Sequence, residues 1–290
     1  MVRGYATDPT MIDLHTHSTF SDGSLPPAEL VGRARQARVI ALALTDHDGM
    51  LGIDAFLAAC TATGIRGVPG VEISVEFKPG TLHMLGYFLN HKAPAVEAAL
   101  AKLRGSRVDR NRVILEKLNR LGCGLAWEDV AKFAAEDVVG RPHFALALIE
   151  KGVVKDKAEA FGRLLGKGKP AYTDRFRLNV AESIGMIRQA GGVPVLAHPF
   201  TLGYERRRLR EFVAELAAQG LQGIEAYYSE HNPDQQKLYL SIAAECGLAV
   251  SGGSDFHGSI NPDIHLGTGF GQLAVPDSLV DLLYARIDRH

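Results

Sequence analysis

The chain has few cysteines and no long hydrophobic run. Its three cysteines, Cys60, Cys123 and Cys246, are odd in number and far apart, which argues against both a disulfide framework and a thiolate metal site. No apolar run is long enough to span a bilayer, and residues 1–10 lack the apolar core of an export signal. We therefore expect a soluble, cytoplasmic protein that does not contact a membrane.

Net charge is also nearly absent, at −1 for 290 residues. Such a chain has no global positive field to hold a long polyanion, although local basic patches can still form. A small anionic substrate therefore fits this balance better than a long duplex does. We find no internal repeat, no low-complexity segment and no sign of an obligate protein partner.

The first 92 residues alternate between strand and helix patterns. We expect strands at 11–14, 39–45, 67–75 and 81–89, the last two forming a hairpin. A helix is predicted after Ser24, whose side chain can cap it, with Leu30, Val31 and Ala34 as its buried stripe. A second helix is predicted at 53–63, with Gly64 ending it.

The middle of the chain changes to helical periodicity without a convincing strand. The predicted helices cover residues 95–121, interrupted at Arg104–Arg107, and residues 127–135, 141–151 and 156–165. From there strands and helices alternate again, with helices at 179–189, 206–219 and 234–246 and strands at 193–197, 223–226 and 249–251. We predict an α/β barrel formed by residues 1–92 and 170–290, with residues 93–169 as an all-helical insertion capping the active site.

Histidines and carboxylates cluster at the predicted strand ends. His15 and His17 stand two residues apart, so both side chains project from one side of a strand. One such pair is a weak signal, but matching residues follow later in the chain. The full candidate set is His15, His17, Asp22, His47, Glu72, His83, His198, Asp255 and His257.

Six imidazoles and three carboxylates without sulfur suit Mn²⁺, Fe²⁺ or Zn²⁺, and we expect Mn²⁺. Nine ligands exceed what one ion needs and fit two or three ions with a bridging carboxylate. Ions about 3.5–4 Å apart can clamp both the attacking and the leaving oxygen of a phosphoryl group. Acid-base catalysis supplies about 10²–10⁴-fold, whereas phosphate monoester hydrolysis can require about 10²¹-fold, so metals are favoured.

Other polar residues could bind a substrate. Arg141 and His143 precede an apolar helix, where they predict either a phosphate clamp or ordinary packing. Lys167 and Lys169 lie in a glycine-rich loop that either approaches a phosphate or is a plain linker. Tyr228 and His231 follow a strand end, where an aromatic ring could stack on a base.

Two further sets have a structural interpretation. Asp46 and Asp48 flank His47, and we expect them to accept hydrogen bonds or cap, because metal-bound imidazoles need an acceptor for the other ring nitrogen. The arginines at 104, 107, 110 and 112, and those at 206–208 and 210, are expected to be solvated helix faces. Contact with nucleic acid is the alternative for both arginine series.

As an ensemble, these motifs resemble the PHP (polymerase and histidinol phosphatase) superfamily of metal-dependent phosphoesterases, from His15 to His257. The resemblance implies a distorted (βα)₇ barrel with a trinuclear site. In that family His15, His17, Glu72 and Asp255 would hold the first metal. Glu72 would bridge to the second, completed by His83 and His198, and Asp22, His47 and His257 would hold the third.

More narrowly, the Gly140–His143 turn and the helical segment resemble the subgroup that removes the 3′-phosphate of 3′,5′-nucleoside bisphosphates such as pAp. Relatives of that subgroup act as 5′–3′ exoribonucleases. The implied catalytic residues are His15, His17, Glu72, His198 and Asp255. Three alternatives stay open: an exonuclease on short single-stranded RNA or DNA, a histidinol-phosphate phosphatase, and a non-catalytic metal-binding module.

Overall fold

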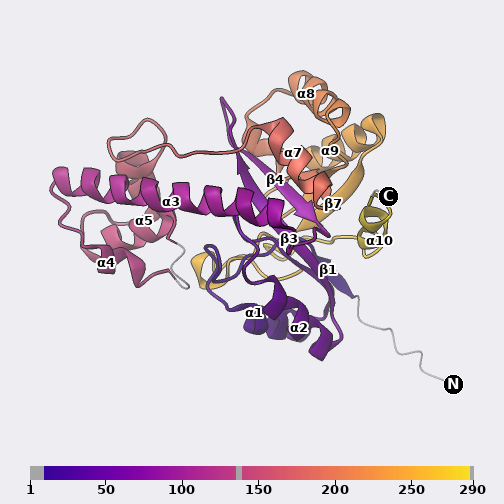
Figure 1. Ribbon diagram of the computed structural model, residues 1–290, viewed down its shortest axis with the longest axis horizontal. Coiled ribbons are helices and arrows are strands. Elements are labelled where there is room, and N and C mark those ends of the chain that lie inside the picture. Colours follow the sequence, from indigo (N-terminus) through magenta and orange to yellow (C-terminus); the bar gives the residue numbers. More distant parts are fainter. Residues whose placement is uncertain (1–9, 135–138, 288–290) are drawn as a thin grey trace.

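The computed structural model describes residues 10–134 and 139–287. Within them one sheet contains seven strands arranged in sequence order (Figure 1). The strands are β1 (Met11–Asp13), β2 (Val39–Leu44), β3 (Arg66–Val75), β4 (Leu82–Tyr87), β5 (Val193–Leu196), β6 (Gly223–Tyr228) and β7 (Ala249–Gly253). Each predicted strand is therefore present, with ends that differ by up to two residues.

The sheet is mixed. Strand β4 runs antiparallel to both β3 and β5, and the four other pairings are parallel. Backbone hydrogen bonds also join the chain at β1 to the chain at β7. The Leu14 N–H donates to the Gly252 carbonyl (3.2 Å), and the His17 N–H donates to the Phe256 carbonyl (2.9 Å). The predicted α/β class, with a mostly parallel sheet and a β3–β4 hairpin, is confirmed.

Helices flank this sheet. In the view of Figure 1, α1 and α2 lie below it, and α7, α8 and α9 lie above it. Their bounds are α1 (Pro27–Gln36), α2 (Ile53–Thr63), α7 (Val180–Gln189), α8 (Arg206–Ala218), α9 (Pro233–Cys246) and α10 (Leu279–Tyr284), with short turns η2 (Pro199–Leu202) and η3 (Gly258–Ile260). The sequence did not predict α10. No helix among the described residues is both long and apolar enough to cross a bilayer.

A separate helical segment lies between β4 and α7 and extends to one side of the sheet (Figure 1). It comprises α3 (Pro94–Arg120), α4 (Trp127–Ala131), α5 (Arg141–Glu150), α6 (Lys157–Ala160) and η1 (Phe161–Leu165). These elements pack around their own cluster of buried residues, which includes Leu118, Phe144 and Leu148. The helix predicted at 127–135 ends at Ala131, and position 135 lies outside the described residues.

The predicted interruption of α3 at residues 104–107 is wrong, because α3 is one continuous helix of 27 residues. Its first half packs into the main core through Leu100 and Leu103, and its second half packs into the helical cluster through Ile114 and Leu118. A glycine within a helix costs only about 1 kcal/mol. Burial at both ends therefore outweighs the penalty at Gly105.

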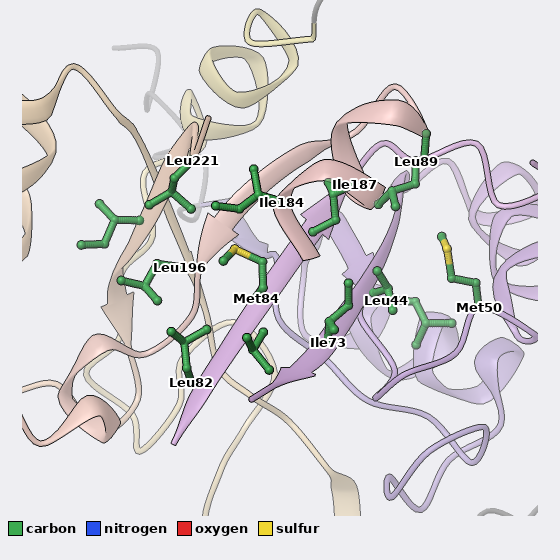
Figure 2. Packing of buried hydrophobic residues seen from close by; sticks show 14 of the residues in the cluster. Leu44, Met50, Ile73, Leu82, Met84, Leu89, Ile184, Ile187, Leu196 and Leu221 are labelled. Carbon is green, nitrogen blue, oxygen red and sulfur yellow. The ribbon is translucent and has the colours of Figure 1, made fainter. Parts of the chain in front are cut away.

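Both faces of the sheet are buried, which explains near-continuous apolar runs such as that of β2. One face carries Leu44, Ile73 and Met84 against α7 (Figure 2). The other face carries the alternate positions, among them Ala43 and Leu85. The strands are thereby fixed in position, and so are the side chains at their ends.

Local capping residues determine the end of one helix but not the start of another. Gly64 ends α2 with a positive φ of 76°, as predicted. The predicted cap at Ser24 is wrong, because α1 begins at Pro27 and has no side-chain cap. The Ser24 hydroxyl oxygen instead accepts the N–H of Ser259, 2.8 Å away. A contact that is distant in sequence therefore replaces the local one.

Strand β7 approaches His15 so closely that only glycine fits at position 253. A Cβ added to Gly253 would overlap the backbone nitrogen and the Cβ of His15. We expect Gly253→Ala to lower the free energy of unfolding by about 1–3 kcal/mol, because overpacking forces the backbone apart. The measurement is denaturant unfolding monitored by circular dichroism.

The matched control is Gly185→Ala in the interior of α7, where an added Cβ meets nothing within 4 Å. Removing a helical glycine there should raise stability by about 0.5–1 kcal/mol. Equal stability of Gly253→Ala and the unchanged protein would contradict the close approach of β7 to His15.

Candidate metal centre

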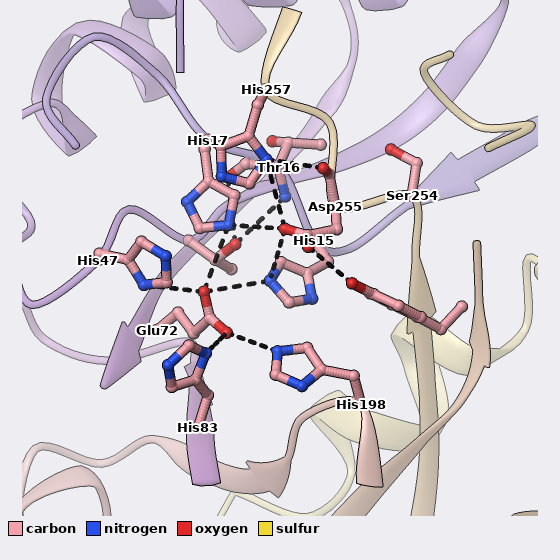
Figure 3. A network of polar contacts seen from close by, with 12 residues as sticks. His15, Thr16, His17, His47, Glu72, His83, His198, Ser254, Asp255 and His257 are labelled. Carbon is pink, nitrogen blue, oxygen red and sulfur yellow. Dashed lines mark hydrogen bonds and ion pairs between the residues drawn. The ribbon is translucent and has the colours of Figure 1, made fainter. Parts of the chain in front are cut away.

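All nine predicted ligand side chains lie in one buried or half-buried cluster around Glu72, and all of them except Asp22 are labelled in Figure 3. The carboxylate of Glu72 is 1% exposed and has five histidines about it. Its Oε2 lies 3.4 Å from His15 Nε2, 3.3 Å from His17 Nε2 and 3.0 Å from His47 Nδ1. Its Oε1 lies 2.7 Å from His83 Nδ1 and 2.9 Å from His198 Nε2.

Three sets of ligand atoms within the cluster each lie within 4.8 Å of one another. They are His15, His17, Glu72 and Asp255; His17, Asp22, His47 and His257; and His47, Glu72 and His83. His198 falls outside these sets and joins the cluster through Glu72. The geometry therefore provides three neighbouring positions that share Glu72, His17 and His47, while the ligand roles themselves stay predictions.

The cluster forms at the ends of strands that are distant in sequence. His83 pairs with Ser74 across the antiparallel β3–β4 hairpin, which places it beside Glu72. His198 and Asp255 lie two residues past the ends of β5 and β7, and both adopt a positive φ, 24° and 60°. Such conformations are strained for residues other than glycine and cluster at functional sites. The surrounding structure thus holds these two side chains in place.

The cluster contains buried polar atoms that have no hydrogen-bond partner among the described residues. They are His15 Nε2, His17 Nε2, His47 Nδ1, Asp22 Oδ1 and Asp255 Oδ1. A buried donor or acceptor left unpaired costs about 1–3 kcal/mol. Nitrogen and oxygen atoms of this kind are the donors that Mn²⁺, Fe²⁺ and Zn²⁺ accept. The residues present therefore fit a cluster of divalent ions.

Electrostatics in the cluster favour cations. Burial raises the pKa of Glu72 and of Asp255, but the surrounding histidines lower both well below their usual range. Burial lowers the pKa of His17, whereas the neighbouring carboxylates of Asp255 and Glu72 raise it more strongly, to about 10. Burial lowers the pKa of His47 to about 4. The carboxylates thus stay charged, and ions bound here would replace the proton on His17.

The sequence did not single out Glu225, which lies behind the cluster in β6. Its side chain is fully buried, its Oε1 lies 2.9 Å from His15 Nδ1, and its Oε2 accepts the backbone N–H of His198 at 2.7 Å. An acceptor on Nδ1 fixes the imidazole tautomer and leaves Nε2 for a metal. The sequence feature that could have identified Glu225 is its position as the one charged residue of an otherwise apolar predicted strand.

The two aspartates that flank His47 have different roles. Asp46 accepts hydrogen bonds from the Ser18 N–H (2.7 Å) and the Ser21 hydroxyl (2.5 Å), and the Ser21 oxygen is 3.4 Å from His17 Nδ1. Asp48 accepts the Ser74 N–H and contacts no imidazole within hydrogen-bond distance among the described residues. It binds two arginines instead, as described below.

A cavity of about 700 Å³ opens onto the cluster, with Asp22, His47 and His83 in its wall. Arg141 and Lys167 also line it, as a substrate site requires. His143 does not: its side chain is 2% exposed, and its Nδ1 accepts the Gly140 N–H at 3.0 Å. That contact caps the start of α5. Of the two roles expected for His143, a phosphate clamp or ordinary packing, it supports packing.

The other three substrate candidates are also absent from this cavity wall in the described part of the chain. Lys169 is exposed beyond it. The Tyr228 hydroxyl donates to Asp255 Oδ2 at 2.8 Å, and the His231 Nδ1–H donates to the Ala226 carbonyl at 2.9 Å. Tyr228 therefore orients a candidate ligand, and its geometry supports that role better than base stacking.

The cavity wall contains four arginines besides Arg141. Arg107 and Arg110 were expected on a solvated helix face, but they are only 8% and 7% exposed. Arg175 and Arg177, from the chain before α7, line the same cavity. The expectation is wrong here because this side of α3 faces the cavity, where Arg107 pairs with Asp48 from the chain after β2. It holds for Arg112, whose side chain is 72% exposed.

The comparison with known proteins places this cluster in a family. The PHP domain model matches residues 13–124. A 3′,5′-nucleoside bisphosphate phosphatase of Chromobacterium violaceum is 35% identical over 85% of this chain and 87% of its own length. The chain belongs to the PHP family. It is a metal-dependent phosphoesterase.

Other PHP relatives extend the likeness over almost the whole chain. A 5′–3′ exoribonuclease of Haemophilus influenzae is 36% identical over 84% of this chain and 89% of its own length. An amidohydrolase structure from Chromobacterium violaceum, with bound sulfate and no metal, has a TM-score of 0.86 at 33% identity, covering 97% of this chain and 98% of that one. A metal-dependent phosphoesterase structure from Bifidobacterium adolescentis has a TM-score of 0.84 at 30% identity, covering 96% and 97%.

Glu225→Gln tests the support behind His15. The amide keeps the volume but offers one oxygen where two acceptors are needed, so we expect metal affinity to fall about 10–100-fold. Affinity is measured by competition with a chromophoric chelator. Glu230→Gln, an exposed site just past β6, is the control and should leave affinity unchanged. Equal metal affinity of Glu225→Gln and the unchanged protein would show that Glu225 does not orient His15.

Removing metal should lower the stability of the protein. Ions that bind the folded state alone stabilise it by about 2.7 kcal/mol at a concentration one hundred times their Kd. Thermal unfolding is therefore expected at a lower temperature after treatment with a chelator, and Mn²⁺ should restore the original midpoint. Identical midpoints with and without metal would rule out this cluster as a metal centre.

Proposed function

We propose that this PHP protein hydrolyses the 3′-phosphate of 3′,5′-nucleoside bisphosphates and releases the 5′-mononucleotide and phosphate. The observation that carries the proposal is one cavity with two kinds of wall. One wall has the candidate metal ligands Asp22, His47 and His83, and the other has cationic side chains, including Arg141 and Lys167. Its volume of about 700 Å³ lies within the range of small-molecule sites.

The proposed architecture is a distorted (βα)₇ barrel with residues 93–169 as a cap. Hydrogen bonds between the chain at β1 and the chain at β7 support closure of the sheet. The helical segment reaches the barrel at several points. Lys157 Nζ donates to the Ile260 carbonyl at 2.7 Å, and the Ser106 hydroxyl donates to the Phe176 carbonyl at 3.2 Å. These contacts support a cap that lies beside the cavity.

In the proposed mechanism the residues that would hold two or three ions, Mn²⁺ or alternatively Fe²⁺ or Zn²⁺, are His15, His17, Asp22, His47, Glu72, His83, His198, Asp255 and His257. Bound there, they would supply activation of water and neutralisation of phosphate charge. Glu225 keeps Nε2 of His15 directed at the centre, and Tyr228 holds the carboxylate of Asp255. Arg141 and Lys167 attract the anionic substrate into the cavity.

A second candidate function uses the same centre on a phosphodiester at the 5′ end of short RNA. The Haemophilus influenzae relative named 5′–3′ exoribonuclease favours it, since it is as similar as the bisphosphate phosphatase. The enclosed arginine wall favours the smaller substrate.

Turnover on pAp distinguishes the two functions. The Mn²⁺-loaded protein should release phosphate from pAp with a kcat/KM at least about tenfold above that on a 5′-phosphorylated trinucleotide, because the cavity has the volume of a small-molecule site. Phosphate release and oligonucleotide shortening are measured side by side, with Glu72→Gln as the inactive control. A preference for the trinucleotide would support the exonuclease, and activity on neither would refute both.

A further inference from the structure

The arginines of the cavity wall carry more positive charge than nearby carboxylates neutralise. Arg107 Nη2 and Arg175 Nη2 both donate to the same oxygen, Asp48 Oδ2, at 2.5 and 2.6 Å. Asp48 is fully buried and serves both. Arg177 pairs with Asp174. One carboxylate therefore faces two guanidinium groups in the interior.

Arg110 has no carboxylate partner among the described residues, although it is only 7% exposed. Its Nε and Nη2 donate to the neutral amide oxygen of Asn111, at 3.2 and 2.8 Å. Burial lowers the pKa of Arg110 well below its usual range, and the positive charges of Arg107 and Arg175 lower it further. A buried charge without a counter-charge is costly and needs a reason.

Donor atoms near Arg110 are likewise unused. Nε of Arg107 and both Nε and Nη1 of Arg175 are buried without a hydrogen-bond partner in the described part of the chain. All three arginines line the cavity that contains His47 and His83. Asp48, which holds Arg107 and Arg175, is the residue after His47. The unused donors are therefore anchored directly next to the candidate metal centre.

We propose that Arg107, Arg110 and Arg175 form a subsite for a second phosphate group of the substrate, one that is not hydrolysed. This rests on the proposed function, because the other phosphate must lie at the metal centre. Several planar guanidinium groups suit a tetrahedral dianion, since each can donate two hydrogen bonds. A phosphate bound there would supply the negative charge that Asp48 alone does not provide for three arginines.

This assignment replaces part of the expected clamp. His143 caps α5 through the Gly140 N–H. The guanidinium of Arg141 lies 5.9 Å from the ring centre of Phe161 and 5.6 Å from that of Tyr172, so it faces an aromatic wall. A purely structural role would explain the pairing of Arg107 and Arg175 with Asp48. It does not explain Arg110, which contacts no carboxylate of residues 10–134 or 139–287 and is nonetheless buried.

The kinetic test compares adenosine 3′,5′-bisphosphate with adenosine 3′-monophosphate, which lacks the second phosphate. We expect the bisphosphate to be preferred, and Arg110→Met to reduce that preference in kcat/KM by about 10–100-fold, the value of charge-assisted hydrogen bonds. Arg112→Met, on the same helix but exposed, is the matched control and should keep the full preference. An equal loss on both substrates, or no loss on either, would overturn the subsite.

A binding measurement separates this inference from the proposed function. Adenosine 5′-monophosphate carries the second phosphate alone, and calorimetric titration of the Mn²⁺-loaded protein needs no turnover. Arg110→Met should weaken its binding about 10–100-fold relative to the unchanged protein and to Arg112→Met. Equal affinity in all three would overturn the subsite even if pAp is hydrolysed. Weakened binding without hydrolysis of pAp would retain the subsite and refute the proposed function.

Discussion

The burial of one carboxylate, Glu72, is the constraint on which the rest of this structure depends. It is 1% exposed and five imidazoles lie within 3.4 Å of its two oxygens. A buried carboxylate is stable only with positive charge around it. The histidines come from β4 and from the chain after β1, β2 and β5, so the folded sheet is what brings this charge together. The fold and the metal centre are therefore parts of one arrangement.

The segment Asp46-His47-Asp48 connects this centre to the rest of the cavity. Asp46 lies towards the metal side, where it holds Ser18 and Ser21 beside His17. Asp48 lies towards the helical segment and holds Arg107 and Arg175. A displacement of either aspartate would therefore disturb both the metal-ligand side and the arginine side of the cavity. The positive φ of Asp48, 56°, turns the chain so that the two aspartates face opposite sides.

Sequence alone predicted the features that follow from local periodicity. The strands of the sheet, the end of α2 at Gly64 and the clustering of the nine histidine and carboxylate side chains follow from short patterns, and the structure has these features. It did not predict contacts between distant segments. Glu225 lies 210 residues from His15, and Ser24 gives up its cap for Ser259. Burial of Arg107 and Arg110 depends on contacts between α3 and distant parts of the chain, such as that of Arg107 with Asp48, which periodicity within α3 does not reveal.

The candidate metal ligands and the cavity arginines come from different stretches of the chain. The candidate ligands come from residues 15–83 and 198–257, whereas the cavity arginines come from residues 107–177. Relatives named for a mononucleotide phosphatase and for an exoribonuclease are 35% and 36% identical to this chain. Overall identity therefore cannot discriminate between the two substrates. Substrate choice is set by groups at the site, so we expect it to depend on the cavity arginines of α3 and of the chain before α7.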